Sequence, residues 1–280
     1  MADAKPTISL VTCSYQQGRY LESTIRSVIG QGYPGLEYIV VDGGSTDETQ
    51  QILQRYRTHM SACLVGRDNG QTDALRKGFT RAGGDILGWL CSDDLLLNGA
   101  LEKVGLYFSR HPEVDVVYGD ALWIDASGDV IRPKMEMPFS RFVLLNDHNY
   151  IPQPSTFWRR SVYDRVGGLD EAFALAMDFD LWERFSRVTT PHHMAEYLSG
   201  MRWYPEQKTM RLSSRRHREN ATLRRRQPPV LSWRPVWPVS RAVAKAARIL
   251  AKARIGGYRR AVPGAHLDWL RTLRIPDSAW

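Results

Sequence analysis

The sequence predicts an α/β protein with a mostly parallel central sheet flanked by helices. Short apolar segments alternate with longer amphipathic ones between residues 7 and 91, and turn residues bound the apolar segments. No apolar stretch reaches the roughly 18 residues that a membrane-spanning helix requires. The apolar segments are therefore expected to lie in a folded core.

The apolar segments are expected to be strands because they are short and lie between turn residues. They cover residues 7–13, 36–41, 62–65 and 85–91, with two more at 114–118 and 121–125. Helices are expected over residues 20–31, about 46–57 and 72–82. Ser45 and Glu48 have the spacing of a capping box, which would start the second of these helices.

The charge is distributed unevenly, although the formal net charge is only +8. Residues 202–280 contain 19 Lys or Arg and 4 Asp or Glu, whereas residues 1–201 contain 19 and 26. Prolines and tryptophans interrupt regular structure from about residue 227. We therefore predict two domains, residues 1–226 and a basic, Pro/Trp-containing helical extension over residues 227–280.

Within this extension a helix is expected over residues 239–255. Four cations share one of its faces because they recur at spacings of three and four: Arg241, Lys245, Arg248 and Lys252. Apolar side chains supply much of the remaining surface. Such a helix can lie on an anionic membrane, or it can pack on the first domain.

The cysteines and the first residues indicate the compartment. Cys13, Cys63 and Cys91 lack metal-ligand spacing and cannot all pair, so they are expected to be reduced thiols. The first six residues have no apolar core of a signal peptide. The expected localisation is cytoplasmic.

Two adjacent aspartates, Asp93 and Asp94, follow the strand expected at residues 85–91. Ligands of open α/β sheets bind at the carboxyl ends of the strands. Two neighbouring carboxylates repel each other unless a cation lies between them, and a divalent metal carrying a polyphosphate would supply that cation. The alternative is a cap for a helix beginning near Leu97, for which one acid would suffice.

Four further polar residues lie near the same edge of the predicted sheet. Asp42 ends a strand and could accept hydrogen bonds from a base or ribose, or form an Asx turn with Gly43-Gly44. Asp68 precedes a turn-forming Asn-Gly pair. Asp73 and Lys77 are four residues apart, so a surface ion pair on a helix also explains them.

A helix around residues 176–185 contains two aspartates. Asp180 lies one turn before Arg184, which predicts a solvated ion pair. Asp178 shares a face with Leu181, Trp182 and other apolar residues, so its carboxyl group should be desolvated and its pKa raised. That environment suits a general base, although an acid favoured by the helix dipole is the alternative.

Three ordered segments carry a family resemblance: residues 7–15, 40–47 (VVDGGSTD) and 88–94 (GWLCSDD). They resemble the inverting nucleotide-sugar glycosyltransferases of family two, over roughly residues 6–212. The resemblance implies a GT-A (Rossmann-like) fold and a nucleoside-diphosphate-sugar donor. It also implies Mg²⁺ or Mn²⁺ on the diphosphate of the donor.

The resemblance implies a nucleotide-sugar pocket lined by Thr12, Asp42, Asp68, Asp73 and Lys77, with Asp42 contacting the base or ribose. Asp93 and Asp94 are implied to bind the donor and its metal as well.

Asp93 and Asp94 lie in the DxD region of the family, where Asp93 would hold the metal with Asp94 beside it. Cys91 takes the position of the first Asp of that motif. Asp178 matches the catalytic base, and Met177 replaces the Glu that precedes it in the family. Tyr204 stands where the family would have a His.

The expected function is metal-dependent, inverting sugar transfer to a hydroxyl acceptor in cell-surface polysaccharide or glycolipid assembly. A lipid-linked acceptor and the inner face of the cell membrane would suit the basic helix. Two alternatives belong to other classes. A nucleotidyltransferase also binds a diphosphate and a metal, and a non-catalytic protein could bind nucleic acid through the tail. The tail contains no recognised nucleic-acid module, so nucleic acid is not an expected partner.

Overall fold

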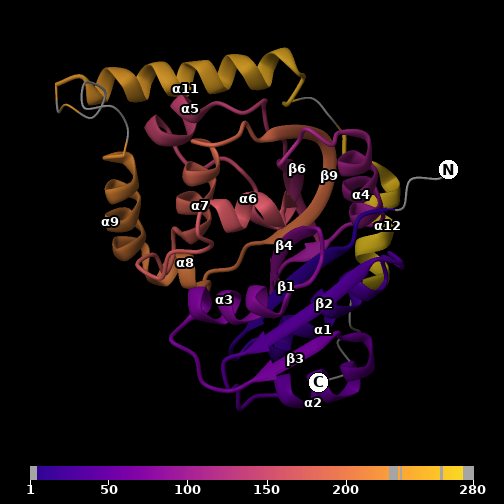
Figure 1. Cartoon of the computed structure of the whole chain (residues 1–280). Helices are drawn as coiled ribbons and strands as arrows, with labels where there is room; N and C mark the ends of the chain where they lie inside the picture. Colours follow the sequence, from indigo (N-terminus) through magenta and orange to yellow (C-terminus); the bar gives the residue numbers. More distant parts are fainter. Residues whose placement is uncertain (1–4, 227–232, 234, 259–260, 274–280) are drawn as a thin grey trace.

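The computed structural model of the chain describes residues 5–226, 233, 235–258 and 261–273. Within these residues, nine strands form one sheet (Figure 1). The strands are β1 (Ile8–Ser14), β2 (Leu36–Asp42), β3 (Ala62–Val65), β4 (Ile86–Cys91), β5 (Leu95–Leu96), β6 (Val116–Ile124), β7 (Val130–Lys134), β8 (Thr156–Arg159) and β9 (His192–Arg202). Their order is β3-β2-β1-β4-β8-β6-β9-β5, with β7 paired to β6.

The first half of the sheet is the parallel unit that the sequence predicts, because β3, β2, β1 and β4 pair in parallel. The second half is mixed. β8 pairs antiparallel with both β4 and β6, whereas β9 runs parallel to β6. The predicted α/β class is confirmed, and the parallel pairing predominates in the N-terminal half.

Helices cover both faces of the sheet (Figure 1). They are α1 (Gly18–Ile29), α2 (Thr49–Arg55), α3 (Gln71–Arg81), α4 (Ala100–Arg110), α5 (Arg141–Asn146), α6 (Arg160–Arg165), α7 (Met177–Phe185), α8 (Lys208–Arg211), α9 (Ser213–Arg224), α11 (Trp237–Arg254) and α12 (Gly264–Leu273). Alternation along β1 divides the core: Leu10 packs with residues of α1 and α4, and Val11 packs with residues of α3 and α7.

Three buried tryptophans fix α7 against the sheet. The rings of Trp89 on β4 and Trp182 on α7 stack with 5.7 Å between centroids. Trp158 on β8 meets both of them edge-on, at 5.4 and 5.5 Å. Such aromatic contacts bury a large apolar area. The first turn of α7 therefore has a defined place above the ends of the central strands.

The C-terminal helices pack on the rest of the protein. In Figure 1, α11 lies across α5, and α12 contacts α1. The predicted helix over residues 239–255 is thereby confirmed as α11. Two of its cations face the protein, since Arg248 pairs with Asp147 at 2.5 Å and Lys252 pairs with Glu136 at 2.8 Å.

The predicted domain boundary begins at residue 227, which lies outside the described residues. The division into residues 1–226 and 227–280 therefore stays a prediction.

Candidate active site

The candidate site lies at the carboxyl ends of β1, β2 and β4, where the sequence analysis places it. The parallel register aligns Cys13 with Cys91 and Ser14 with Asp42 at this edge. The turns that follow these strands carry the acidic residues. This edge is where open α/β sheets bind their ligands.

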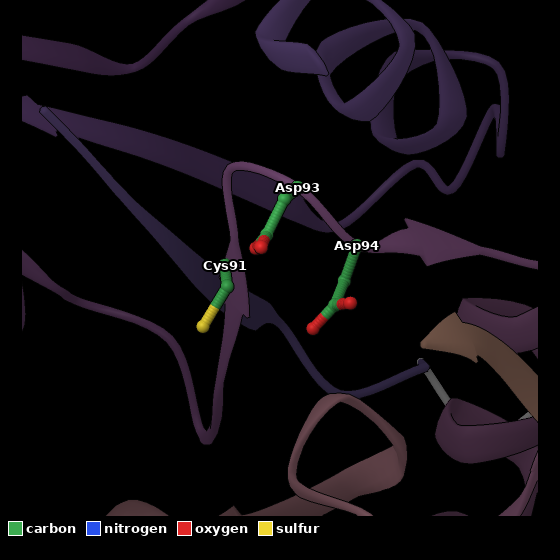
Figure 2. Close-up of side chains that lie close together, drawn as sticks. All are labelled: Cys91, Asp93 and Asp94. Carbon is green, nitrogen blue, oxygen red and sulfur yellow. The ribbon is translucent and has the colours of Figure 1, made fainter. Parts of the chain in front are cut away.

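Asp93 and Asp94 lie on the turn after β4 and converge with Cys91 (Figure 2). One ligand atom from each of the three residues lies within 4.8 Å of the other two. Burial, followed by the charge of Asp93, raises the pKa of Asp94 well above its ordinary value. A divalent cation would relieve this repulsion, and oxygen donors suit Mg²⁺ and Mn²⁺. The residues present therefore fit the metal that the family resemblance implies.

The acidic pair does not cap the next helix. α4 begins at Ala100, and its N-cap is Gly99 in the left-handed conformation, without a side-chain cap. Asp94 Oδ1 instead accepts a hydrogen bond from the backbone N–H of Arg202, at 2.9 Å. The alternative interpretation of the pair as a helix cap is therefore wrong.

The partners of the acidic pair come from the end of β9 and the segment after it. The Tyr204 hydroxyl donates to Asp93 Oδ2 at 2.9 Å. The buried guanidinium of Arg202 donates to the main-chain oxygens of Asp93, at 2.8 Å, and Asp125, at 2.9 Å. Because this cation holds main-chain oxygens, it does not form an ion pair with the two carboxyl groups. The charge of Arg202 lowers the pKa of Asp94 but does not offset the effect of burial and of Asp93, so a bound cation would favour the ionised pair.

Tyr204 is a partner whose role the sequence did not indicate, although it stands where the family would have a His. Burial raises the pKa of its hydroxyl above the ordinary value, and the charge of Asp93 acts in the same direction. The hydroxyl therefore stays protonated at neutral pH and can donate to Asp93.

Asp42 is fully buried, and its carboxylate is used within the loop after β2. Oδ2 accepts from the N–H groups of Gly44 (3.1 Å) and Ser45 (2.8 Å) and from the amide of Gln50 (2.8 Å). Oδ1 accepts from the Ser45 hydroxyl at 2.5 Å. The structure thus shows the turn-forming alternative for Asp42. Because the Ser45 hydroxyl is held there and α2 begins at Thr49, the predicted capping box is wrong.

Thr12 lies inside the sheet and not in the site. It is fully buried, and its hydroxyl accepts a hydrogen bond from Tyr38 at 3.2 Å. Alternation along β1 turns Thr12 to the same side as Leu10, into the core beneath α1. The predicted contact between Thr12 and a nucleotide sugar is therefore wrong.

Tyr15, Gly43 and Asp68 lie together beyond the strand ends. A Cβ built on Gly43 would lie 2.7 Å from Asp68 Oδ2 and 3.2 Å from Tyr15 Cδ2, so glycine permits this close approach. Tyr15 is 61% exposed. Asp68 Oδ1 accepts from the N–H of Gly70 at 2.8 Å. Here a flat aromatic ring and a carboxylate face solvent side by side.

Asp73 and Lys77 form the ion pair that was the alternative to ligand binding, at 2.9 Å. Asp73 also accepts from the N–H of Asn69 at 2.8 Å, and Lys77 donates to the main-chain oxygen of Arg67 at 3.3 Å. The hydrogen bond from Asn69, and then the one from Lys77, lower the pKa of Asp73. The pair therefore fixes the loop that carries Asp68.

Asp178 lies in the first turn of α7 and is partly buried. Its Oδ1 accepts from the N–H of Phe179 at 2.7 Å, and its Oδ2 accepts from Asn149 Nδ2 at 2.9 Å. Burial raises the pKa of Asp178 from 3.8 to about 6, because these hydrogen bonds offset only part of the desolvation. The rise in pKa predicted from the apolar helix face is confirmed.

The N-terminus of α3 connects the acidic cluster with the helix of Asp178. Gln71 Nε2 donates to Cys91 Sγ at 3.3 Å. The hydroxyl of the next residue, Thr72, contacts Met177 Sδ at 3.0 Å, directly before Asp178. The thioether that replaces the family's Glu thus packs against α3, and a short path of contacts joins the two parts of the site.

Lys208 adds a cation beside this path. Its Nζ donates to Gln71 Oε1 at 3.4 Å and to the main-chain oxygen of Ala174 at 3.1 Å. Burial lowers the pKa of Lys208.

The Asp180–Arg184 ion pair is present, but it is buried and not solvated as predicted. The side chain of Asp180 has no exposed surface, and both Arg184 and Arg226 contact it at 2.5 Å. Arg226 follows α9, a contact that no local spacing could predict. Asp180 therefore anchors α7 and is unavailable as a base.

Comparison with known proteins agrees with this arrangement. The sequence profile of Glycosyl transferase family 2 matches residues 9–167. The uncharacterized glycosyltransferase Rv1514c of Mycobacterium tuberculosis is 29% identical over 189 residues, covering 66% of this chain and 71% of that protein. The O-antigen biosynthesis protein RfbC of Myxococcus xanthus is 32% identical over 191 residues, 66% of this chain and 15% of that protein. A putative teichuronic acid biosynthesis glycosyltransferase, TuaG of Bacillus subtilis, is 37% identical over 106 residues, 37% of this chain and 42% of TuaG.

Two solved structures share the fold. S. aureus TarS 1–349 in complex with UDP-GlcNAc superposes with a TM-score of 0.62 at 18% identity, covering 78% of this chain and 66% of that one. The mannosyltransferase PcManGT from Pyrobaculum calidifontis, in complex with GDP-Man and Mn²⁺, gives 0.60 at 18% identity, covering 95% and 79%. This likeness confirms the predicted GT-A type of fold. The chain spans less than two thirds of the TarS, RfbC and TuaG chains.

Proposed function

Because the chain belongs to Glycosyl transferase family 2 and is a glycosyltransferase, we propose that it moves a sugar from a nucleoside-diphosphate-sugar to a hydroxyl acceptor with inversion at the anomeric carbon. The observation that carries this proposal is the convergence of Cys91, Asp93 and Asp94 at the carboxyl edge of the sheet. We propose Mg²⁺ or Mn²⁺ as the cofactor, held by Asp93 and Asp94.

A metal at this place would neutralise the charge that develops on the departing diphosphate. Asp93 is held in position by the Tyr204 hydroxyl, and Asp94 by the main chain of Arg202. Cys91 offers a sulfur atom on the side facing α3. The proposed ligands are the two carboxylates, and such oxygen donors suit both Mg²⁺ and Mn²⁺.

Donor recognition is proposed for the surface formed by Tyr15, Gly43 and Asp68. The exposed ring of Tyr15 can stack on a nucleobase, and the carboxylate of Asp68 can accept hydrogen bonds from a base or ribose. Asp73 and Lys77 act indirectly by holding the loop of Asp68. Asp42 acts in the same way, through the turn that places Gly43.

Asp178 is proposed as the general base. With a pKa of about 6 it is mostly ionised at neutral pH and still basic enough to take a proton from an acceptor hydroxyl. Its Oδ2 is oriented by Asn149, and the hydroxyl would then attack the anomeric carbon from the side opposite the diphosphate. Direct attack in one step is the basis of the proposed inversion.

The acceptor is proposed to be a growing cell-surface polysaccharide or a lipid-linked saccharide. The relatives RfbC and TuaG are described by O-antigen and teichuronic acid biosynthesis, and both are similar to the domain that carries this site. Nucleic acid is not proposed as a partner. The localisation proposed is cytoplasmic, at the inner face of the cell membrane.

Among the described residues, the helices are too short or too polar to cross a bilayer. A peripheral membrane contact is proposed instead, through the outward face of α11. That face exposes Val239, Val243, Ile249 and Leu250, each between 42 and 62%. These apolar side chains recur at helical spacing, and the exposed Arg254 lies on the same side of the helix, whereas Arg241 and Lys245 share the face of Arg248 and Lys252. An apolar stripe beside cations can bind an anionic lipid surface.

Thermal-shift measurements with nucleoside diphosphates and their sugars, with and without Mn²⁺, test the proposed function. Binding of one nucleotide sugar should raise Tm, and Mn²⁺ should increase the effect. The donor that binds is then incubated with candidate acceptors. Release of a nucleoside diphosphate supports the proposal, whereas release of pyrophosphate would identify a nucleotidyltransferase and refute it.

A further inference from the structure

The helix α11 contacts the protein through two of its cations and through small side chains, of which Ala244 is fully buried and Ala251 packs against the main core. Arg248 and Lys252 point inward, whereas Val243 and Leu250 point to solvent. Both ion pairs are formed with the segment between β7 and β8, through Asp147 and Glu136. This segment also carries the residue that contacts the proposed base.

Asp147, in the segment between β7 and β8, contacts both α11 and α9. Its carboxylate accepts from Arg248 Nε at 2.5 Å, and both side chains are less than a fifth exposed. Its main-chain oxygen accepts from Arg224 of α9 at 3.2 Å. Burial acts to raise the pKa of Asp147, but the hydrogen bond from Arg248 and the charge of His148 outweigh it and hold the pKa below its ordinary value. The carboxylate of Asp147 is therefore ionised, and its position depends on α11.

Two residues later, Asn149 reaches the proposed base. Its Nδ2 donates to Asp178 Oδ2 at 2.9 Å. An ionised carboxylate can only accept hydrogen bonds, so the amide presents the NH₂ end that stabilises the ionised form of Asp178. Its Oδ1 is buried and has no hydrogen-bond partner in the described part of the chain. A buried carbonyl oxygen without a partner is costly, so this atom is suited to accept a hydrogen bond from a bound molecule. Asn149 thus holds Asp178 through one end of its amide and, among the described residues, keeps a free acceptor at the other.

We propose that Arg248 of α11 is a positioning residue for Asp178, acting through Asp147 and Asn149. This inference rests on the proposed role of Asp178 as the general base. Arg248 fixes the main chain at Asp147, which places the Asn149 amide against Asp178 Oδ2. The C-terminal helix is thereby part of the catalytic arrangement, and a change in the seating of α11 alters the orientation of the base.

The charged groups around Asp178 decide whether a change in its pKa, read from the pH dependence of activity, can be assigned to the loss of the Asn149 hydrogen bond. On α7 the nearest is Asp180, which Arg184 and Arg226 neutralise. From α9, Glu219 accepts from the N–H of Ala176 at 3.0 Å and pairs with Arg215 at 2.8 Å. In the segment between β7 and β8, the groups are Asp147 and His148, which pair with each other at 3.1 Å. Arg248 reaches Asp178 only through this segment. A shift in the base's titration on changing Arg248 therefore reports the loss of the Asn149 hydrogen bond.

The test compares full-length Arg248→Met, Arg248→Lys and Asn149→Ala in steady-state assays of nucleoside diphosphate release across pH. A water-soluble acceptor is used, so that membrane contact plays no part. Arg248→Met should lower kcat about 10-fold with little change in the donor KM, because the donor surface lies elsewhere. It should also raise the apparent pKa of the acidic limb of kcat/KM by about one unit, because a hydrogen bond to the ionised carboxylate is lost.

Three comparisons make the result specific. Arg248→Lys keeps the charge and should restore part of the activity. Arg248→Met in the Asn149→Ala background should add no further pKa shift, because both act through the same hydrogen bond. The matched control is Arg55→Met, which breaks the Arg55–Glu22 pair at 2.9 Å between α2 and α1 and should keep the parent profile.

The outcomes separate this inference from the proposed function. If Asn149→Ala shifts the profile and Arg248→Met does not, or if the two shifts add, the positioning role of Arg248 is refuted while the base assignment stands. If Asp178→Asn retains turnover, the base assignment itself fails. Thermal unfolding of each variant shows whether it is folded, and an Arg248→Met protein that loses activity only in proportion to unfolding also overturns the inference.

Discussion

Asp178 leads to a prediction in which activity and stability change in opposite directions. Its pKa is raised by burial from 3.8 to about 6, so the folded state disfavours the ionised form. A shift of about two units corresponds to ~3 kcal/mol, and partial exposure to solvent reduces this to ~1–2 kcal/mol. The penalty is nearly absent below pH 3.8, grows as the pH rises to about 6 and is fully present above that value.

Asp178→Asn removes the ionisable group and keeps the size of the side chain. At pH 7.5 the variant should therefore unfold about 2–6 °C above the parent, while nucleoside diphosphate release falls ~10²–10⁴-fold. At about pH 5 roughly half of this gain in Tm should remain, because part of the parent's penalty is already relieved by protonation. The measurement is thermal unfolding of both proteins at the two pH values, together with product release.

Asp180→Asn is the matched control, with the same substitution two residues along α7. Its carboxylate is fully buried between Arg184 and Arg226, so the change leaves two cations without their partner. Breaking a buried ion pair costs about 3–5 kcal/mol, and Tm should fall. If Asp178→Asn lowers Tm as Asp180→Asn does, the argument that the ionised carboxylate of Asp178 destabilises the folded protein is wrong.

Three further predictions concern the metal, its support and the membrane face. Asp94→Asn should abolish the rise in Tm that Mn²⁺ and a nucleoside diphosphate give together; an unchanged rise would exclude Asp94 as a ligand. Tyr204→Phe removes the hydrogen bond to Asp93 and should raise the Mn²⁺ concentration for half-maximal activity about 10-fold, whereas no change would show that Tyr204 does not support the site. Val243→Glu with Leu250→Glu should reduce sedimentation with phosphatidylglycerol vesicles; Val188→Glu, on another exposed valine, should not, and equal recovery of all proteins would end the membrane proposal.

The sequence by itself determined the elements whose signals are local. An apolar segment ending in Asp42 located β2, and one followed closely by Asp93 and Asp94 located β4 and the same edge of the sheet. The adjacent Asp93 and Asp94 predicted a concentrated negative charge at that edge, and the structure brings their ligand atoms together. The position of Asp178 on an apolar helix face predicted its raised pKa. Periodicity, charge and residue type suffice for such features because they depend on a few neighbouring residues.

Only the tertiary structure decided which of several plausible partners each side chain takes. Thr12 lies in a segment with the family pattern, but the pleat of β1 turns it into the core. Ser45 has capping spacing, yet the buried carboxylate of Asp42 competes for its hydroxyl. Tyr204 reaches Asp93, and Arg248 reaches Asp147, from positions far along the chain. These pairings depend on how distant elements pack, and packing satisfies buried charges and hydrogen bonds that no local spacing encodes.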